Sequence, residues 1–336
     1  MTASNFFIVL VPGYMGSKLR DRRTGQIVWL DIPSLLRDIF QIDDNLKRMF
    51  ESMRYPNDNL EPAGIVEDVL FLPPLFKSEQ YGRLLAALQN YGCSQPDQPV
   101  SGKIPLYTFA YDWRQDNRIS ARQLAARVHG WRAAHHGAKA WLVGHSNGGI
   151  VSRWYIEKEG GKDDVERLFL MGSPWDGAPK ALQVLLDGLD IFLTRLFSAS
   201  LDINALTRQT ILSFPSFYQL VPHHYEFLRD TSGKKIDPFK DLSWLENDRQ
   251  RQMLLDARKF NQDLGTTLSV DSLCFFGDKQ LTTSRGVVQK TTGKWQKITW
   301  QQTERGDGTV PLPSAIHPYA REKLPFLASH GDIYIV

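Results

Sequence analysis

The sequence contains little cysteine and no long hydrophobic run. Among its 336 residues, only Cys93 and Cys274 are cysteines. They form neither a zinc-ligand spacing nor a disulfide framework, so we expect a reducing, cytoplasmic environment. No apolar run approaches the roughly 18 residues of a membrane span, and the N-terminal segment lacks the basic start and the apolar length of a signal peptide. Secretion by a route without an N-terminal signal is compatible with the same features.

Strong net charge, repeats and low-complexity tracts are also absent from the sequence. The formal net charge of +3 is too small, for a chain of this size, to indicate nucleic-acid binding. The apolar content of 42% and the charged content of 23% are ordinary for a globular protein. The chain is longer than a usual single core, but α/β folds reach this length with insertions. We therefore predict one domain over residues 1–336.

The most informative stretch of the chain joins a short apolar run to a helical pattern. Residues 140–143 have the length of a buried strand, and residues 150–158 have the pattern of a helix. Between them, the sequence Gly-His-Ser-Asn-Gly at 144–148 matches the G-x-S-x-G nucleophile elbow. Glycine-rich turns between a strand and a helix also bind phosphates or simply pack closely. The strand and helix around the pentapeptide favour Ser146 as a nucleophile held above the sheet edge.

Strands and helices are predicted to alternate along most of the chain. We predict strands at 6–11, 104–110, 140–143, 165–171 and 272–276, and helices at 81–91, 119–134 and 150–158. This alternation predicts an α/β fold with a mostly parallel sheet flanked by helices, in which ligands bind at the carboxyl ends of the strands. A hairpin is predicted over 287–300.

Two segments depart from this alternation. Residues 20–80 are predicted to be an excursion from the core that shapes a substrate entrance, because prolines interrupt the helical patterns there. Residues 180–265 contain several helical pieces, and we predict a helical cap or lid over the site. Within it, Leu182–Phe197 forms an apolar helix with a face that is broad for a surface helix. This face either contacts acyl chains or a membrane surface, or it packs against the cap's own core.

The loop after the first strand fits an oxyanion hole. In serine hydrolases of this architecture, one amide comes from such a loop and another from the residue after the nucleophile. Those amides are the backbone N–H groups of Tyr14 and Asn147. Gly13 would let the loop approach a substrate carbonyl, and Gly144 and Gly148 would leave room for a strained turn at the serine. An ordinary glycine turn is the alternative for the loop.

A serine hydroxyl is a weak nucleophile, so it needs a base and an acid that orients the base. Of the eight histidines, only His317 and His330 follow the later strands. His330 lies in a short Ser-His-Gly-Asp turn from which an imidazole can reach the serine, so we favour it over His317. Asp307, between two glycines, and Asp278, directly after a strand, both suit the acid. Chain order alone does not decide between them.

His223 and His224 form a tempting pair for a metal ion. No third ligand stands near them in the sequence, so we predict a surface or capping role for the pair and no metal site. A mechanism based on a serine, a histidine and a carboxylate needs no organic cofactor either.

Five segments of the sequence together resemble one known family. They are Val-Pro-Gly-Tyr-Met-Gly-Ser-Lys-Leu at 11–19, Tyr-Asp-Trp-Arg at 111–114, the elbow at 144–148, Gly-Ser-Pro-Trp-Asp-Gly at 172–177 and Gly-Asp-Gly-Thr-Val-Pro at 306–311. This set resembles the lecithin:cholesterol acyltransferase family, in the family's order and over nearly the whole chain. The family includes phospholipid:diacylglycerol acyltransferases and lysosomal phospholipases, and the resemblance implies an α/β-hydrolase fold with a cap and a lid.

The resemblance also implies a catalytic triad and two oxyanion amides. The matching residues are Ser146, Asp307, His330, Tyr14 and Asn147. The family's triad acid lies in the segment that contains Asp307, which decides against Asp278. We interpret Asp112 and Arg114 as an ion pair that braces the site rather than as catalytic groups.

The apolar cap and the resemblance indicate a lipid ester as substrate, most of all a glycerophospholipid. An acyl-enzyme would release a fatty acid to water or pass the acyl group to a lipid alcohol. Peripheral membrane contact through the cap and a regulatory protein partner are compatible with this function. The alternatives are a carboxylesterase for small soluble esters, an amidase or peptidase with the same triad, and a non-catalytic lipid-binding or partner-gated protein on this fold.

Overall fold

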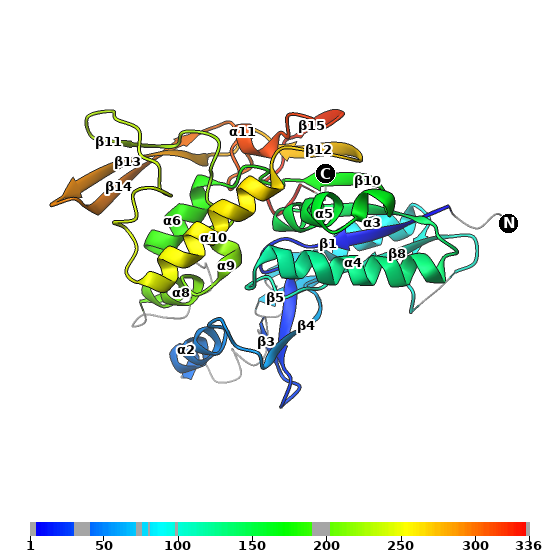
Figure 1. Cartoon of the computed structure of the whole chain (residues 1–336). Helices are drawn as coiled ribbons and strands as arrows, with labels where there is room; N and C mark the ends of the chain where they lie inside the picture. Colours follow the sequence, from blue (N-terminus) through cyan, green and yellow to red (C-terminus); the bar gives the residue numbers. More distant parts are fainter. Residues whose placement is uncertain are drawn as a thin grey trace.

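A seven-stranded sheet forms the centre of the computed structural model (Figure 1). The structure describes residues 5–29, 41–71, 76–79, 81–97, 100–189 and 202–333. In spatial order, the strands of the sheet are β15 (Glu322–Phe326), β12 (Asp271–Gly277), β10 (Val165–Met171), β9 (Lys139–His145), β1 (Phe6–Val11), β8 (Ile104–Thr108) and β7 (Cys93–Ser94). All neighbouring strands of this sheet pair in parallel. The predicted parallel sheet is therefore confirmed.

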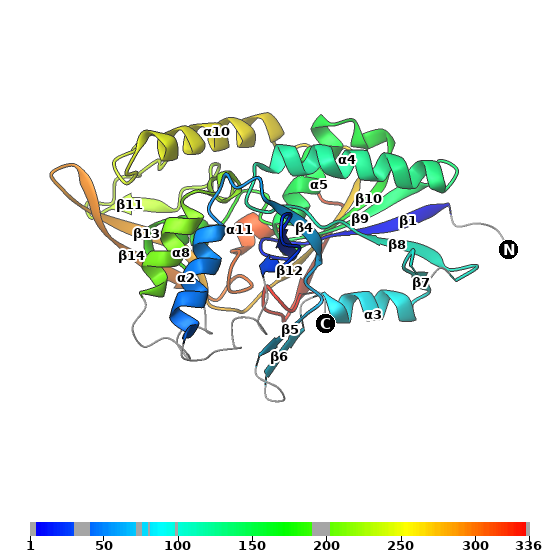
Figure 2. The ribbon, with the colours of Figure 1, turned by 90° about the horizontal axis from the view of Figure 1, so that it is seen from below.

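Helices cover both faces of the sheet (Figure 2). On one face lie α4 (Asn117–Ala134) and α5 (Asn147–Lys158), and on the other lies α3 (Gly82–Asn90). Helix α4 begins after Asp116, whose side chain caps it by accepting the N–H of Arg118. All three helices lie where the sequence pattern predicts them, with ends that differ by at most three residues.

The side chains of β1 show why the sheet needs a cover on both faces. Phe7 lies in the same buried cluster as Leu124 and Val128 of α4. The next residue, Ile8, lies in a second cluster with Leu84 of α3. Because successive side chains of a strand point to opposite faces, a continuous apolar run buries surface on both sides of the sheet.

A second group of elements stands beside the carboxyl ends of the sheet strands (Figure 1). Its helices and strands are α6 (Pro179–Asp187), α8 (Ile203–Ile211), α9 (Pro215–Tyr218), α10 (Asp248–Leu264), β11 (Leu228–Asp230), β13 (Thr282–Thr291) and β14 (Lys294–Thr303). β13 and β14 form the predicted hairpin, which is longer than the sequence pattern suggested, and β11 pairs with β13. That residues 180–265 act as a cap or lid stays a prediction.

The segment from 20 to 80 forms short strands and a helix outside the central sheet. β2 (Ser17–Asp21) pairs antiparallel with both β3 (Ile27–Trp29) and β4 (Leu60–Ile65). The remaining elements are α2 (Ile42–Ser52) and the hairpin of β5 (Asp68–Phe71) with β6 (Phe76–Glu79). Residues 30–40 of this segment lie outside the described residues. The role of this segment in shaping an entrance also stays a prediction.

The apolar helix predicted over Leu182–Phe197 is wrong in its extent. Helix α6 ends at Asp187, because Gly188 turns the chain with a φ of +83°. A Cβ at Gly188 would lie 2.0 Å from the carbonyl oxygen of Asn204, so the chain needs glycine at this turn. Residues 190–201 lie outside the described residues.

Within α6, the apolar side chains are covered by protein. Leu182 and Leu185 are fully buried in the main hydrophobic cluster. The described part of this segment therefore supports packing against neighbouring elements rather than contact with a membrane surface. No helix among the residues that the structure describes is long and apolar enough to span a membrane.

Candidate active site

Ser146 lies at the sharp turn between β9 and α5, as the elbow pattern predicts. Its φ of 51° and ψ of −125° place it in a region that residues with a side chain rarely adopt. Its N–H donates to the carbonyl oxygen of Met171 in β10 at 2.9 Å, which holds the strained turn in place. The turn presents Oγ at the N-terminus of α5, where the helix dipole favours developing negative charge.

Three glycines give this turn the space that it needs. A Cβ on Gly148 would lie 2.2 Å from a carbonyl oxygen at the end of β1, and one on Gly144 would lie 2.6 Å from a Cα of α5. A Cβ on Gly13 would lie 2.8 Å from the Cβ of Ser146. The elbow and the loop after β1 therefore pack backbone against backbone, which larger residues would prevent.

The side chains of Ser146, His330 and Asp307 form one hydrogen-bonded line. Oγ of Ser146 lies 2.9 Å from Nε2 of His330, and Nδ1 of His330 lies 2.7 Å from Oδ2 of Asp307. The three residues follow β9, β15 and β14, and their loops meet at one edge of the sheet. Asp278, the rival acid, instead accepts the N–H of Lys279. Of the two carboxylates that chain order left open, Asp307 is the one that contacts His330.

Asp307 is held rigidly by the turn in which it lies. Its Oδ1 accepts the N–H groups of Thr309 at 2.9 Å and Val310 at 2.7 Å. Its own carbonyl oxygen accepts the N–H of His330 at 2.8 Å. Burial opposes ionisation, but His330 and the two N–H donors hold the pKa of the carboxyl below its usual value. An ionised, immobile carboxylate is suited to orient an imidazole and to stabilise its protonated form.

The two expected oxyanion amides belong to the loop after β1 and to the residue that follows the serine. Tyr14 follows Gly13 in the loop after β1, and Asn147 is the first residue of α5. The first N–H groups of a helix have no acceptor within the helix. Among the residues that the structure describes, no protein acceptor is found for the N–H of Tyr14 or of Asn147. The side chain of Asn147 is fixed by Asn117 at 2.9 Å and by the hydroxyl of Tyr111 at 3.1 Å.

The ion pair expected between Asp112 and Arg114 is present and buried. Nε and Nη2 of Arg114 donate to the two carboxylate oxygens at 2.9 and 2.7 Å. The guanidinium also donates to the carbonyl oxygens of Met53 at 2.9 Å and Asn57 at 3.3 Å. It therefore ties the segment after α2 to the loop after β8, and its contacts are those of a structural brace.

The family model for lecithin:cholesterol acyltransferase matches residues 62–315, most of the chain. The chain belongs to this family. Lysosomal phospholipase A and acyltransferase of Bos taurus is 24% identical to it over 358 residues, which cover 92% of this chain and 81% of the relative. Family membership and the fold together support a lipid-ester hydrolase or acyltransferase.

The chain in the crystal structure of the Tle4–Tli4 complex shows the same fold at low sequence identity. A chain in the crystal structure of the Tle4–Tli4 complex superposes with a TM-score of 0.68 and 13% identity, over 98% of this chain and 96% of that chain. The mature lipase BlEst2 of Bacillus licheniformis gives a TM-score of 0.43 and 13% identity, over 98% of this chain and 86% of that chain. The α/β-hydrolase fold implied by the sequence resemblance is confirmed.

Two further residues, Tyr81 and His145, form hydrogen bonds that connect the loop after β1 to His330 of the candidate triad. The hydroxyl of Tyr81 lies 2.7 Å from Nδ1 of His145 and accepts the N–H of Gly13 at 2.7 Å. Nε2 of His145 lies 3.0 Å from the carbonyl oxygen of His330. His145 lies within the elbow pattern at 144–148, so the sequence placed it beside the serine. No sequence pattern indicated Tyr81, because it lies 64 residues before His145 in the chain.

The other histidine considered as a base, His317, is buried away from the serine. Its Nδ1 accepts the N–H of Tyr319, and its ring packs against Trp175. Burial, with a smaller contribution from Arg153, lowers the pKa of His317 to about 3. This neutral, fully buried imidazole packs against its neighbours. Its position agrees with the prediction that His330, rather than His317, is the base.

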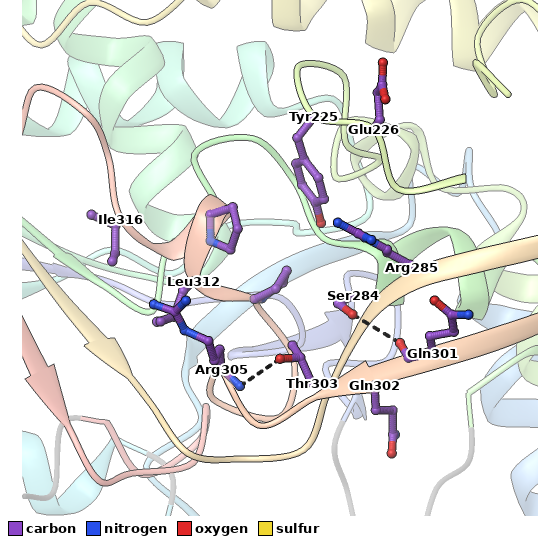
Figure 3. A pocket seen from close by; sticks show the side chains of 12 residues that line it. Tyr225, Glu226, Ser284, Arg285, Gln301, Gln302, Thr303, Arg305, Leu312 and Ile316 are labelled. Atoms are coloured by element: carbon purple, nitrogen blue, oxygen red, sulfur yellow. Dashed lines mark hydrogen bonds between the residues drawn. The ribbon is translucent and has the colours of Figure 1, made fainter. Parts of the chain in front are cut away.

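A cleft of about 670 Å³ borders the loop that contains Asp307 (Figure 3). It lies between the β13–β14 hairpin and α11 (Leu312–Ala315), with Tyr225 and Arg285 on one side and Arg305 and Leu312 on the other. The N–H of Leu312 donates to the carbonyl oxygen of Arg305 at 3.2 Å and closes the loop. None of the candidate triad residues lines this cleft.

Proposed function

We propose that the protein is a serine lipase of the phospholipase A type that cleaves an acyl ester of a glycerophospholipid through an acyl-enzyme. Ser146 is the nucleophile, His330 is the general base and acid, and Asp307 orients the imidazole. The observation that carries the proposal is the unbroken line of hydrogen bonds from Oγ of Ser146 to Nε2 of His330 and from Nδ1 to Asp307, at 2.9 and 2.7 Å. Family membership supports the lipid substrate.

In the first half of the reaction, Oγ of Ser146 attacks the ester carbonyl carbon while Nε2 of His330 takes the hydroxyl proton. The N–H groups of Tyr14 and Asn147 donate to the oxyanion that forms. Asp307 accepts from Nδ1–H and stabilises the imidazolium. The tetrahedral intermediate collapses, and Nε2 returns the proton to the departing lysolipid alcohol.

In the second half, the acyl group leaves Ser146. Water, or the hydroxyl of a lipid alcohol, attacks the acyl carbonyl while His330 again acts as the base. Water gives a fatty acid and alcohol gives a new acylated lipid. The relative from Bos taurus has both activities in its name, phospholipase A and acyltransferase. This supports a site that water and a lipid alcohol can both reach.

The test compares wild-type protein with Ser146→Ala on mixed phospholipid vesicles, with the lipids analysed by mass spectrometry. A matched control is Ser329→Ala, because Ser329 is adjacent to His330 but its hydroxyl donates to Asp332. We expect fatty acid and lysolipid, or acylated lipid, from the wild type and from Ser329→Ala only. Covalent labelling by a fluorophosphonate should be lost in Ser146→Ala alone. Turnover of short soluble esters without turnover of phospholipid would replace the proposal with a carboxylesterase.

A further inference from the structure

Two neighbouring histidines and one distant carboxylate converge at the boundary between the sheet and the adjoining helices. Nδ1 of His223 and Nδ1 of His224 each lie 3.0 Å from Oδ1 of Asp176. Asp176 comes from the loop after β10, 47 residues before His223. The expectation that no third ligand accompanies the histidine pair is thus wrong in three dimensions. We propose that Asp176, His223 and His224 bind a divalent transition-metal ion, with Zn²⁺ as the ion that fits them best.

The carboxylate of Asp176 is fixed in position by three backbone N–H groups and by the ring of His224, whose Nδ1 forms a hydrogen bond of 3.0 Å with Oδ1. The Asp176 side chain is 1% exposed, and it accepts the N–H groups of His223 at 3.2 Å, His224 at 2.9 Å and Tyr225 at 3.0 Å. Among the described residues, no lysine or arginine forms an ion pair with it. A metal ion would supply the positive charge that a buried carboxylate requires.

His223 supplies a buried ring nitrogen that has no hydrogen-bond partner among the described residues. Its side chain is 11% exposed, and neither ring nitrogen makes a hydrogen bond with a described residue. The contact between its Nδ1 and Oδ1 of Asp176 lacks hydrogen-bond geometry. A cation between the two atoms would turn this contact into coordination.

His224 completes the set from the solvent side. Its side chain is 41% exposed, and its ring stacks on Trp175 with a centroid distance of 5.3 Å. The three donor atoms lie within 4.8 Å of one another. Zinc bonds of about 2.1 Å in a tetrahedron place ligand atoms about 3.4 Å apart, so small side-chain adjustments suffice. The exposed edge of His224 leaves a position for water and a route for the ion.

Such an ion would fasten the turn at 223–225 to the loop after β10. That loop also approaches the candidate triad, since a Cβ at Gly172 would lie 3.2 Å from Nδ1 of His330. The ligand set of two imidazoles and one carboxylate suits zinc better than magnesium or calcium, which prefer all-oxygen sites. The site is separate from the proposed acyl-transfer chemistry and does not depend on it.

The experiment measures metal binding on the whole chain, prepared without a histidine tag and dialysed against a chelator. Isothermal titration with ZnCl₂ gives stoichiometry and affinity, and CoCl₂ gives a visible absorption band that reports nitrogen and oxygen ligands. The variants are His224→Gln, His223→Gln and Asp176→Asn. Because His224 is partly exposed, His224→Gln tests the site even if the buried substitutions unfold. His136→Gln is the control, from the other adjacent histidine pair of the chain.

We expect one zinc ion per chain in the wild type and in His136→Gln, together with a rise in melting temperature on adding zinc. Loss of a second-shell group weakens binding by about 10- to 100-fold, so loss of the direct ligand in His224→Gln should weaken it at least that much. Equal zinc affinity in the wild type and in His224→Gln would overturn the proposal, as would a wild type that binds no zinc. These readouts do not depend on lipid turnover, so failure of the proposed function leaves them interpretable.

Discussion

The imidazole of His145 donates from Nε2 to the backbone carbonyl oxygen of His330, at 3.0 Å. A carbonyl oxygen only accepts, so Nε2 has the proton and Nδ1 accepts from the hydroxyl of Tyr81. Burial, with a contribution from His330, lowers the pKa of His145 to about 3 and keeps the ring neutral. Because the oxygen of Tyr81 also accepts the N–H of Gly13, one chain of bonds connects the oxyanion loop to the catalytic histidine candidate.

Tyr81→Phe should therefore lower kcat more than it changes KM. Leaving buried groups without partners costs about 1–3 kcal/mol, which is a fall of roughly 5- to 160-fold if it acts on the transition state. The measurement is kcat and KM on a soluble ester. Tyr107→Phe is the matched control, because Tyr107 makes a similar bond to His135 at 2.6 Å far from the serine. Equal kcat values for the two variants would show that the chain of bonds has no positioning role.

Asp307→Asn should reduce kcat by about 10³- to 10⁴-fold while leaving the fold intact, because an amide no longer fixes the imidazole as the carboxylate does. The control is Asp278→Asn, at the acid that chain order also allowed and that accepts only a local N–H. Fluorophosphonate labelling rates report the same difference without a lipid substrate. A larger loss in Asp278→Asn than in Asp307→Asn would reverse the assignment.

Arg114→Met should lower the free energy of unfolding but leave the activity per folded molecule unchanged. Removing one partner of a buried ion pair costs about 3–5 kcal/mol, since it leaves Asp112 buried without its cation. Arg118→Met breaks a pair of similar geometry with Asp116, but both side chains there are partly exposed. We expect its cost to be about 1 kcal/mol or less. Urea denaturation of both variants, with activity normalised to folded protein, separates a brace from a catalytic group.

Gly13→Ala should lower activity, because the new Cβ would press on the Cβ of Ser146 at 2.8 Å. Gly130→Ala, in the middle of α4 with open space around it, should instead stabilise the protein by about 0.5–1 kcal/mol. Melting temperature and ester hydrolysis measured on both variants check the pair. Full activity in Gly13→Ala would mean that the loop after β1 has room to move away from the serine.

Because of His317, the free energy of unfolding should decrease as the pH falls. Its folded pKa of about 3 lies below the ordinary value, so below about pH 6.5 the unfolded chain binds a proton that the folded chain does not. Stability from this residue is therefore present at neutral pH and lost as the pH falls from about 6.5 toward 3. Denaturation of His317→Asn at pH 6 and pH 5 should show a decline smaller than that of the wild type by about 1 kcal/mol. Parallel declines in the two proteins would contradict the assignment.

Local sequence was enough to predict the parallel sheet, the main helices and the turn at Ser146. Apolar runs such as 6–11 and the pattern around 144–148 report interactions with residues nearby in the chain, and these interactions determine strands, helices and turns. The pattern failed at Gly188, where the long apolar run continues but the close approach of Asn204 requires a turn.

Tertiary structure decided which distant side chains meet. Asp307 rather than Asp278 faces His330 because the turn at 306–311 folds back beside β12, where Gly277 leaves space for it: a Cβ there would lie 2.5 Å from that of Asp307. Tyr81 reaches His145, and Asp176 reaches His223, only because helices and loops from separate parts of the chain pack on the same sheet edge. Such contacts depend on the packing of the whole chain, and no pattern of neighbouring residues encodes them.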